Sequence, residues 1–284
     1  YTKDQIVVST GAKQSIANVV LSIVGPGDEV IVPAMTWVST AEAVVLVGAT
    51  PVFWDTDKQG LLRSDWEKAV TPKTKAVIAV DAFGNPSGMH EIARICKEHN
   101  LPFIEDAACA IGSSEHGVPV GNIADMTCFS FHPRKLLTTG EGGAITLNKS
   151  DWSAWLDTKL NHGASGMQGF GMDFVEYGYN YRLSEPQALM GRVQLKKIDA
   201  IVAERKNGPF TSIFDMTKRV SLRVCNKRAF ESLAYAGGFD SFPGVHRAQY
   251  FAIDPSGRSF LENAVRYGAS FQEQENSAQA SMFG

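Results

Sequence analysis

The sequence lacks several features that mark particular classes of protein. Its 284 residues carry a formal net charge of -3 at pH 7, and so small a charge gives no general attraction to nucleic acid or to an anionic membrane. No apolar run reaches the ~20 residues that a membrane-spanning helix needs. The polar start, Tyr1-Thr2-Lys3-Asp4, has neither an initiating Met nor the pattern of a secretory signal. We therefore expect a cytoplasmic protein without a membrane span, present as a fragment or without its natural start.

Cysteine is also scarce in this chain. The four cysteines, Cys96, Cys109, Cys128 and Cys225, have neither the close spacing of a metal site nor that of a disulfide framework. We expect them to be buried thiols in a reducing compartment, and we expect no metal site.

The first two thirds of the chain alternate short apolar runs with amphipathic helical patterns. The runs are 6–8, 29–32, 51–54, 76–80, 102–104, 126–129 and 144–147. Apolar strands that alternate with helices are typical of a mostly parallel sheet whose two faces are both covered by helices. The sequence therefore predicts an α/β domain of three layers over residues 1–200.

The pattern changes near residue 200. Residues 195–206 predict one charged helix, and beyond Asn207-Gly208-Pro209 the strand runs stop. We therefore expect a small, mainly α-helical segment over residues 201–271. From Gln272 the chain is polar, and residues 272–284 are predicted to be a disordered tail.

An acid and a lysine follow two of the predicted strands. Asp106 comes after Phe103-Ile104-Glu105, at the carboxyl end of a strand, where α/β sheets place their ligands; a helix N-cap is the alternative role. Lys135 follows the strand that contains Phe129, between aromatic and glycine-rich segments that predict a buried loop. Burial favours a neutral amine, which can attack an aldehyde, although a lone lysine is more often solvated at the surface.

An enzyme that uses pyridoxal phosphate requires such a pair. The lysine amine forms a Schiff base with the aldehyde of the cofactor. The acid keeps the pyridine nitrogen protonated, so that the ring can accept electrons. The sequence therefore predicts that Lys135 and Asp106 are catalytic and that pyridoxal phosphate is the cofactor.

Further residues could hold this cofactor. Ser130, which precedes Lys135 by five positions, could bind its phosphate. Gly11-Ala12-Lys13 precedes a predicted helix, whose free N–H groups and dipole suit a phosphate, although a plain helix start explains it equally well. Trp37 follows a strand and could stack on a flat ring, or it could be a core aromatic. Asn180, before another predicted helix, is by itself an ordinary cap.

Taken together, these stretches resemble the DegT/DnrJ/StrS family of sugar aminotransferases, of the fold-type-I pyridoxal phosphate class. The resemblance covers about residues 34–200 and includes 33–40, 48–53, 104–108, 129–135, 138–143, 162–163 and 180–182. It implies that Lys135 carries the cofactor as an internal aldimine and that Asp106 pairs with the pyridine nitrogen. It also implies that Ser130 contacts the phosphate and that Trp37 stacks on the ring.

The resemblance has consequences for assembly and activity. It implies that Asn180 reaches the phosphate of the cofactor in a partner subunit, and hence a homodimer. Cys109 stands where the family commonly has Gln or His, so any contact from this position to the cofactor differs. The implied reaction moves an amino group from glutamate to a keto group of a nucleotide-linked sugar. Because the smaller C-terminal domain of the family is replaced here, we expect cofactor binding with weak or absent turnover.

The two ends of the chain resemble other families. Residues 1–33, with the turn at 9–15, are similar to class I aspartate aminotransferases, which use the same turn to hold phosphate. Residues 201–284 resemble the alpha subunit of bacterial DNA polymerase III, in a region that contains a helix-hairpin-helix module. Gln279-Ala280-Ser281-Met282-Phe283 is similar to the sliding-clamp motif of that subunit. The alternative function is therefore a DNA-binding or clamp-binding module.

A join between the two families falls within residues 201–206. Both families carry an Ile-x-x-Glu-Arg-like helix at this point, so a crossover would not interrupt the helical sequence pattern. The sequence therefore predicts a chimera, which arose by engineering or by mis-assembly of the sequence.

Overall fold

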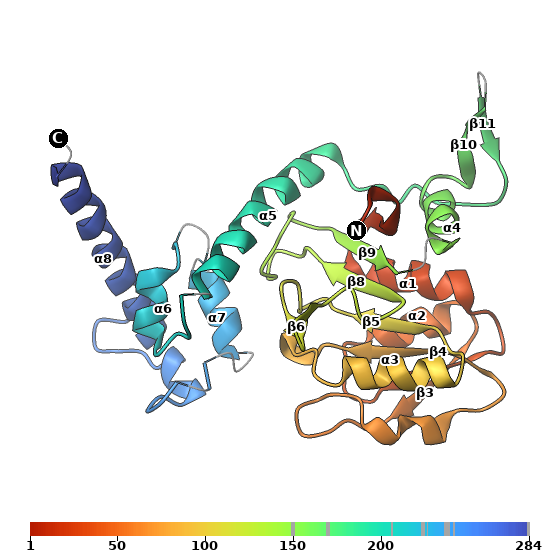
Figure 1. Ribbon diagram of the computed structural model, residues 1–284, viewed down its shortest axis with the longest axis horizontal. Helices are drawn as coiled ribbons and strands as arrows, with labels where there is room; N and C mark the ends of the chain where they lie inside the picture. The colour runs from red at the N-terminus through yellow and green to blue at the C-terminus, as the bar shows by residue number, and fades with distance from the viewer. Residues whose placement is uncertain are drawn as a thin grey trace. The chain divides into compact units, whose positions relative to one another are not determined.

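The computed structural model describes residues 1–148, 151–168, 171–205, 207–222, 225, 227–235, 239–240 and 242–282. It divides into two compact units, Tyr1–Gly191 and Arg192–Gly284. The sequence pattern predicts a division near residue 200, whereas the structure places it inside the long helix α5 (Glu185–Arg205) (Figure 1). Because this boundary lies within one continuous helix, no break in the sequence pattern marks it.

The first unit is built on a seven-stranded sheet (Figure 1). Its order is β1 (Ile6–Ser9), β9 (Gly143–Leu147), β8 (Met126–Ser130), β5 (Phe103–Asp106), β4 (Thr74–Val80), β2 (Glu29–Pro33) and β3 (Thr50–Trp54). The strand β9 pairs antiparallel with both β1 and β8, and the other neighbours are parallel. The mostly parallel sheet predicted from the sequence is confirmed.

Helices cover both faces of this sheet. One face shares an apolar core with α1 (Ala12–Ile23), α2 (Ser39–Leu46) and α4 (Asp151–Leu160). The other face shares a second core with α3 (Met89–Glu98) and the turn η2 (Ser64–Ala69). Helix α3 buries Met89, Ile92, Ile95 and Cys96, which have the three-to-four-residue spacing of one helix face. The predicted three-layer α/β class is therefore confirmed.

The first unit also contains several short elements. They are η1 (Lys3–Gln5), η3 (Ala82–Gly84), the pair β6 (Ser114–Glu115) and β7 (Val118–Pro119), and the pair β10 (Ala164–Gln168) and β11 (Gly171–Phe174). In the part of the chain that the structure describes, no helix is long and apolar enough to cross a membrane.

The alternation of side chains along β5 decides which carboxyl faces which layer. Ile104 lies in the core shared with α1, and Phe103 lies in the core shared with α3. Because successive strand residues point to opposite faces of a sheet, Asp106 faces the α1 side and Glu105 faces the α3 side. All four residues of this strand are buried, so both carboxyls are carried into the interior.

The second unit has a core of its own. It contains α6 (Ile213–Arg219), α7 (Lys227–Tyr235), η4 (Arg247–Phe251) and α8 (Phe260–Met282). Phe230, Phe239, Tyr250 and Leu261 are almost fully buried in this core. The unit is mainly helical, as the sequence pattern of residues 201–271 predicts.

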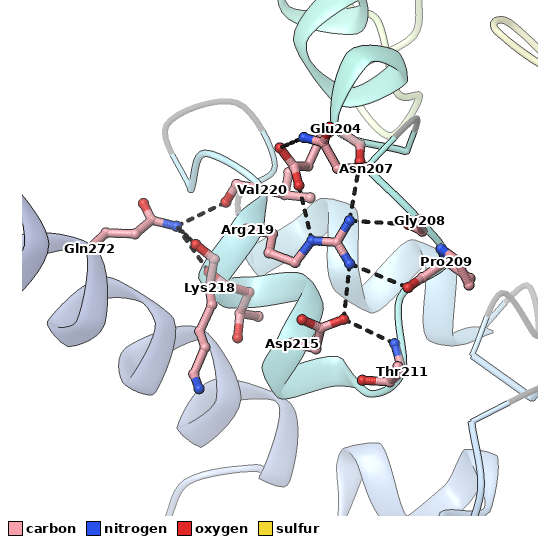
Figure 2. A network of polar contacts seen from close by, with 11 residues as sticks. Glu204, Asn207, Gly208, Pro209, Thr211, Asp215, Lys218, Arg219, Val220 and Gln272 are labelled. Atoms are coloured by element: carbon pink, nitrogen blue, oxygen red, sulfur yellow. Dashed lines mark hydrogen bonds and ion pairs between the residues drawn. The ribbon is translucent and has the colours of Figure 1, made fainter.

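Helix α8 runs through most of the segment that the sequence predicts to be disordered. Residues 272–282 belong to this helix, and Gln272 supplies a physical reason. Its Nε2 donates hydrogen bonds to the carbonyls of Thr217, Lys218 and Val220, at 2.9, 3.1 and 3.0 Å (Figure 2). These carbonyls lie at the C-terminal end of α6, where a helix leaves such groups without an internal partner. One polar side chain thus caps α6 and holds α8 beside it.

Arg219 ties the end of α5 to α6 (Figure 2). Its guanidinium donates to Oε1 of Glu204 at 2.9 Å and to Oδ2 of Asp215 at 3.1 Å. It also donates to the carbonyl of Gly208 at 3.0 Å. Hydrogen bonds between ionised groups are stronger than neutral ones, so this network fixes the turn between the two helices.

We expect Gly268→Ala to destabilise the second unit by about 2 kcal/mol, the typical cost of overpacking. Gly268 lies where α8 passes α6, and a Cβ at this position would lie 2.3 Å from the carbonyl oxygen of Thr217. Hydrogen exchange of the amides in α6 and α8 measures the change. Ser270→Ala, at an exposed position of the same helix, is the control. Equal protection in the two variants would contradict the close approach of the helices.

Candidate functional site

Residues from distant parts of the sequence meet at one edge of the sheet. Ser9 of β1 pairs with Gly143 of β9, and Gly143 pairs with Ser130 of β8. On the next strand, Asp106 of β5 pairs with Cys128 of β8. This edge holds the carboxyl ends of the parallel strands, where α/β folds bind their ligands.

Asp106, the last residue of β5, is 4% exposed. Its Oδ2 accepts a hydrogen bond from the hydroxyl of Thr40 at 3.2 Å, and its Oδ1 accepts one from the N–H of Ala108 at 3.2 Å. Burial raises the pKa of Asp106, whereas these two hydrogen bonds and the charge of Lys135 oppose the shift. The sequence pattern gives Thr40 no role, although it lies within the 33–40 stretch of the resemblance.

Lys135 lies in the turn that follows β8, where its N–H donates to the carbonyl of His132 at 2.9 Å. Its side chain is half-buried, and the adjacent Leu136 is exposed, so the loop is more open than the flanking residues predict. The Nζ of Lys135 donates a hydrogen bond to Sγ of Cys109 at 2.8 Å, and its charge lowers the pKa of the buried Asp106. The structure thus brings Lys135, Asp106 and Cys109 together.

The N-terminus of α1 opens onto the same edge of the sheet. The helix begins at Ala12, and within the described ranges no side chain caps it at Gly11. Gly143 packs directly on this turn, since a Cβ there would lie 2.6 Å from the carbonyl carbon of Gly11. The first N–H groups of the helix and its dipole therefore suit an anion at this edge. The Nζ of Lys13 lies 5.6 Å from the ring centroid of Trp37, which is 63% exposed.

Ser130 and Asn180 occupy different surroundings. Ser130 is 7% exposed, and its Oγ accepts a hydrogen bond of 3.4 Å from the N–H of His132. Asn180 is exposed, and its Oδ1 accepts a hydrogen bond of 3.1 Å from Nε of Arg182. Its backbone forms a bridge with Asn161. Ser130 therefore joins the edge of the sheet near α1, whereas Asn180 lies with the segment after β11, and its contact with a partner subunit's cofactor stays a prediction.

These side chains fit pyridoxal phosphate. Lys135 supplies an amine, the buried carboxyl of Asp106 would gain a cationic partner from a protonated pyridine ring, and the open N-terminus of α1 would gain an anionic one from the phosphate. Across the described residues there is no cluster of three or more His, Cys, Asp or Glu side chains that could hold a metal ion.

The sequence pattern does not reveal a further group of buried carboxyls, which includes Asp81 after β4 and Glu105 on β5. Asp81 is 1% exposed, and neither of its carboxyl oxygens has a hydrogen-bond partner in the described part of the chain. Burial raises its pKa to about 9, and the charges of Glu105, Asp106 and Glu115 add to this shift. Glu105 accepts a hydrogen bond of 2.7 Å from the hydroxyl of Thr127. Burial and these neighbouring charges therefore favour the protonated form of Asp81.

The fold and the site define the class of protein. A model of the DegT/DnrJ/EryC1/StrS aminotransferase family matches residues 2–210, and the chain belongs to this family. The match includes residues 2–33, so this family extends over the start of the chain, where the sequence predicts a likeness to class I aspartate aminotransferases. A second model, of a helix-hairpin-helix motif, matches residues 188–250.

Two curated relatives are similar to the first part of the chain. GDP-perosamine synthase of Caulobacter vibrioides is 39% identical over 185 residues, which cover 64% of this chain and 49% of that protein. UDP-N-acetyl-3-dehydro-alpha-D-glucosamine 3-aminotransferase of Acidithiobacillus ferrooxidans is 42% identical over 180 residues, which cover 62% and 48%. The chain thus spans about half the length of the curated relatives it matches.

Solved structures give the same class. A putative sugar aminotransferase from Streptococcus pneumoniae, in a PLP form, has a TM-score of 0.66 and 29% identity over 75% of this chain and 59% of that one. An aminotransferase from Psychrobacter cryohalolentis has a TM-score of 0.66 and 33% identity over 74% and 56%. The PseC aminotransferase of Helicobacter pylori covers 95% of this chain at a TM-score of 0.66, but its 22% identity shows the fold alone.

The sliding-clamp prediction gains no support from these matches. Gln279 to Met282 of the expected motif lie in α8, and Phe283 lies outside the described residues.

We expect Asp81→Asn to make the stability of the first unit less dependent on pH. An unfolded Asp titrates near pH ~4, whereas in the folded unit the pKa of Asp81 is about 9. Unfolding therefore releases a proton between these values. The contribution of Asp81 to stability is fully present below pH ~4 and is lost as pH rises through the folded pKa. Asn keeps the shape of the side chain and has no proton to release.

Tryptophan fluorescence during thermal unfolding measures this effect, because all five tryptophans lie in the first unit. The variant and the native chain are compared from about pH 5 to about pH 9. Asp173→Asn, at an exposed position, is the control. A pH profile of Asp81→Asn that parallels the native one would show that Asp81 is ionised in the fold.

Proposed function

We propose that Tyr1–Gly191 form the cofactor-binding part of a pyridoxal phosphate-dependent aminotransferase that moves an amino group from glutamate to a keto group of a nucleotide-linked sugar. The observation that carries this proposal is the meeting of the Lys135 amine and the buried Asp106 carboxyl at the sheet edge where α1 begins. The curated relatives support the substrate class, since their names contain GDP- and UDP-linked sugars.

The two central residues have roles that their surroundings allow. When bound, pyridoxal phosphate supplies an aldehyde and an electron-accepting ring. The amine of Lys135 would bind the aldehyde carbon, and its Nζ would later carry a proton as general acid and base. The carboxylate of Asp106 would hold the proton on the pyridine nitrogen, and its burial strengthens that ion pair.

The remaining residues would bind the phosphate and cover the ring. The N–H groups of Gly11-Ala12-Lys13, the Lys13 amine and the Ser130 hydroxyl would hold the phosphate at the start of α1. Trp37, whose ring lies close to the Lys13 amine, would stack on one face of the ring. Cys109 would meet the cofactor beside Lys135, where it already contacts the amine.

Two further features of the chain bear on its assembly and on its turnover. The exposed Asn180 would reach the phosphate of a partner subunit's cofactor, so the active form is a homodimer. The family resemblance implies a second domain that closes the substrate site, whereas Arg192–Gly284 form a separate helical unit. We therefore propose cofactor binding with weak or absent turnover.

The purified chain mixed with pyridoxal phosphate is expected to gain a visible absorbance band, and Lys135→Ala is expected to lose it entirely. Borohydride is expected to fix the cofactor on the peptide that contains Lys135, because reduction makes a lysine–cofactor bond permanent. Lys97→Ala, at an exposed position of α3, is the control. A band of equal strength in Lys135→Ala would overturn the role given to this lysine.

A second function is favoured by one observation on the second unit. The helix-hairpin-helix model matches residues 188–250, and we infer that this unit binds the phosphate backbone of DNA. The side chains of Arg258 and Arg266 line a depression together with Lys227, whose amine pairs with Glu262 and Glu231. Cationic groups of this kind bind DNA by replacing its counterions.

Fluorescence anisotropy with a labelled DNA duplex is expected to show binding that weakens steeply as salt rises. Replacing Arg258 and Arg266 together by Ala is expected to weaken it about tenfold at low salt, whatever the DNA sequence. Lys75→Ala, at an exposed position of the first unit, serves as the control. If the chain does not bind the DNA duplex at low salt, the second unit is not a DNA-binding module.

We also propose that the two matched families were joined in one chain. Their matches overlap at residues 188–210, and the predicted join at 201–206 lies inside this overlap. Sequencing the encoding DNA across codons 195–210 in an independent clone tests the join. One uninterrupted native gene would refute mis-assembly.

A further inference from the structure

Cys109 differs from the other three cysteines of the chain. Cys96, Cys128 and Cys225 are buried, whereas Cys109 is exposed. Burial raises the pKa of Cys96 and of Cys225 to about 12, and it raises that of Cys128 well above its ordinary value. Because the thiolate is the form of cysteine that reacts with oxidants, the three buried sulfurs are inert. Cys109 is the sulfur that an oxidant can reach.

The position of Cys109 is fixed by its loop. Gly84, with a φ of +85°, packs against this loop so closely that a Cβ on it would lie 2.8 Å from the carbonyl oxygen of Cys109. The hydroxyl of Ser113 donates a hydrogen bond of 2.9 Å to the carbonyl of Gly84. The backbone of Cys109 is thus held in place shortly after Asp106, the last residue of β5.

The nearest polar contact of this sulfur is the amine of Lys135. The distance from Nζ to Sγ is 2.8 Å, although 26 positions separate the two residues in the sequence. If the Cys109 sulfur were oxidised, the Lys135 nitrogen would therefore already be in contact with it. Sulfenic acids condense with nitrogen to give a sulfur–nitrogen bond.

We propose that Cys109 and Lys135 form a reversible sulfur–nitrogen cross-link when hydrogen peroxide oxidises the free site. In the first step the sulfur attacks the peroxide, the O–O bond breaks, an S–O bond forms and one water leaves. The sulfur is oxidised by two electrons and the peroxide is reduced. In the second step the neutral Lys135 amine attacks the sulfur, the S–O bond breaks and a second water leaves with one proton of the amine.

The cross-link removes the amine that the cofactor needs. Its Nζ would be bonded to sulfur, so oxidation and loading with pyridoxal phosphate exclude each other. This consequence rests on the proposed function, whereas the cross-link itself does not. Two equivalents of a thiol would restore both side chains, because the first forms a mixed disulfide with Cys109 and frees the amine, and the second releases the Cys109 thiol.

The test uses the full chain, treated with hydroxylamine to release any cofactor and then with hydrogen peroxide. Intact mass is expected to fall by two hydrogen atoms, and a digest is expected to contain one species that joins the Cys109 and Lys135 peptides. Dithiothreitol is expected to restore the original mass. Cys109→Ser and Lys135→Arg are each expected to abolish the joined species, while the peptides of Cys96, Cys128 and Cys225 stay unmodified in the same digest.

Two outcomes would overturn the proposal. One is a Cys109 that gains oxygen atoms while Lys135 remains free, and the other is a joined species that persists in Cys109→Ser. A second arm adds pyridoxal phosphate before the peroxide, and protection from cross-linking is expected. A cross-link that forms equally with and without pyridoxal phosphate would refute cofactor binding at Lys135 and leave the cross-link standing, so the two ideas fail separately.

Discussion

The antiparallel pairing of β9 with β1 and β8 is the constraint on which the site depends. It carries Gly143 against the turn at Gly11, at a distance that leaves no room for a Cβ. Through this contact the start of α1 lies at the same edge as Ser130, and the parallel pairing of β5 with β8 brings Asp106 to that edge. Backbone N–H groups that are already in place would therefore hold an anion at this edge, and such preorganised groups need no rearrangement when a ligand arrives.

Buried carboxyls lie at the ends of β4 and β5 in the first unit. Taking an unpaired charge out of water is costly, and a protein lowers that cost by protonation or by partners. Burial favours the protonated form of Asp81, whereas Asp106 receives two hydrogen bonds and the influence of the Lys135 charge. Burial still raises the pKa of Asp106, so it disfavours the ionised form. A cationic ring that binds there would therefore gain more from the carboxylate than it would in water.

The layers of the first unit, and the placement of Asp106 and Lys135 at the ends of strands, could be predicted because they depend on local pattern. Asp106 and Lys135 each follow an apolar run bounded by turn residues, and such runs indicate strands. Spacing does not reveal contacts that depend on strand register, such as Lys135 with Cys109 or Thr40 with Asp106. The segment from Gln272 onward is a second example. Its polar composition predicts disorder, whereas the Gln272 side chain donates hydrogen bonds to carbonyls 52 to 55 positions earlier in the sequence.

The pleat of β5 restricts how this part of the chain can vary in length. Glu105 and Asp106 are neighbours in sequence but face opposite layers. A one-residue slip of the strand would turn Glu105 toward α1 and Asp106 toward α3, because every side chain of a slipped strand changes face. An insertion or deletion between α3 and β5 therefore keeps the site only if it leaves each residue of β5 on its present face. A shift of the strand by an odd number of residues would put Glu105 in the place of Asp106 without any substitution.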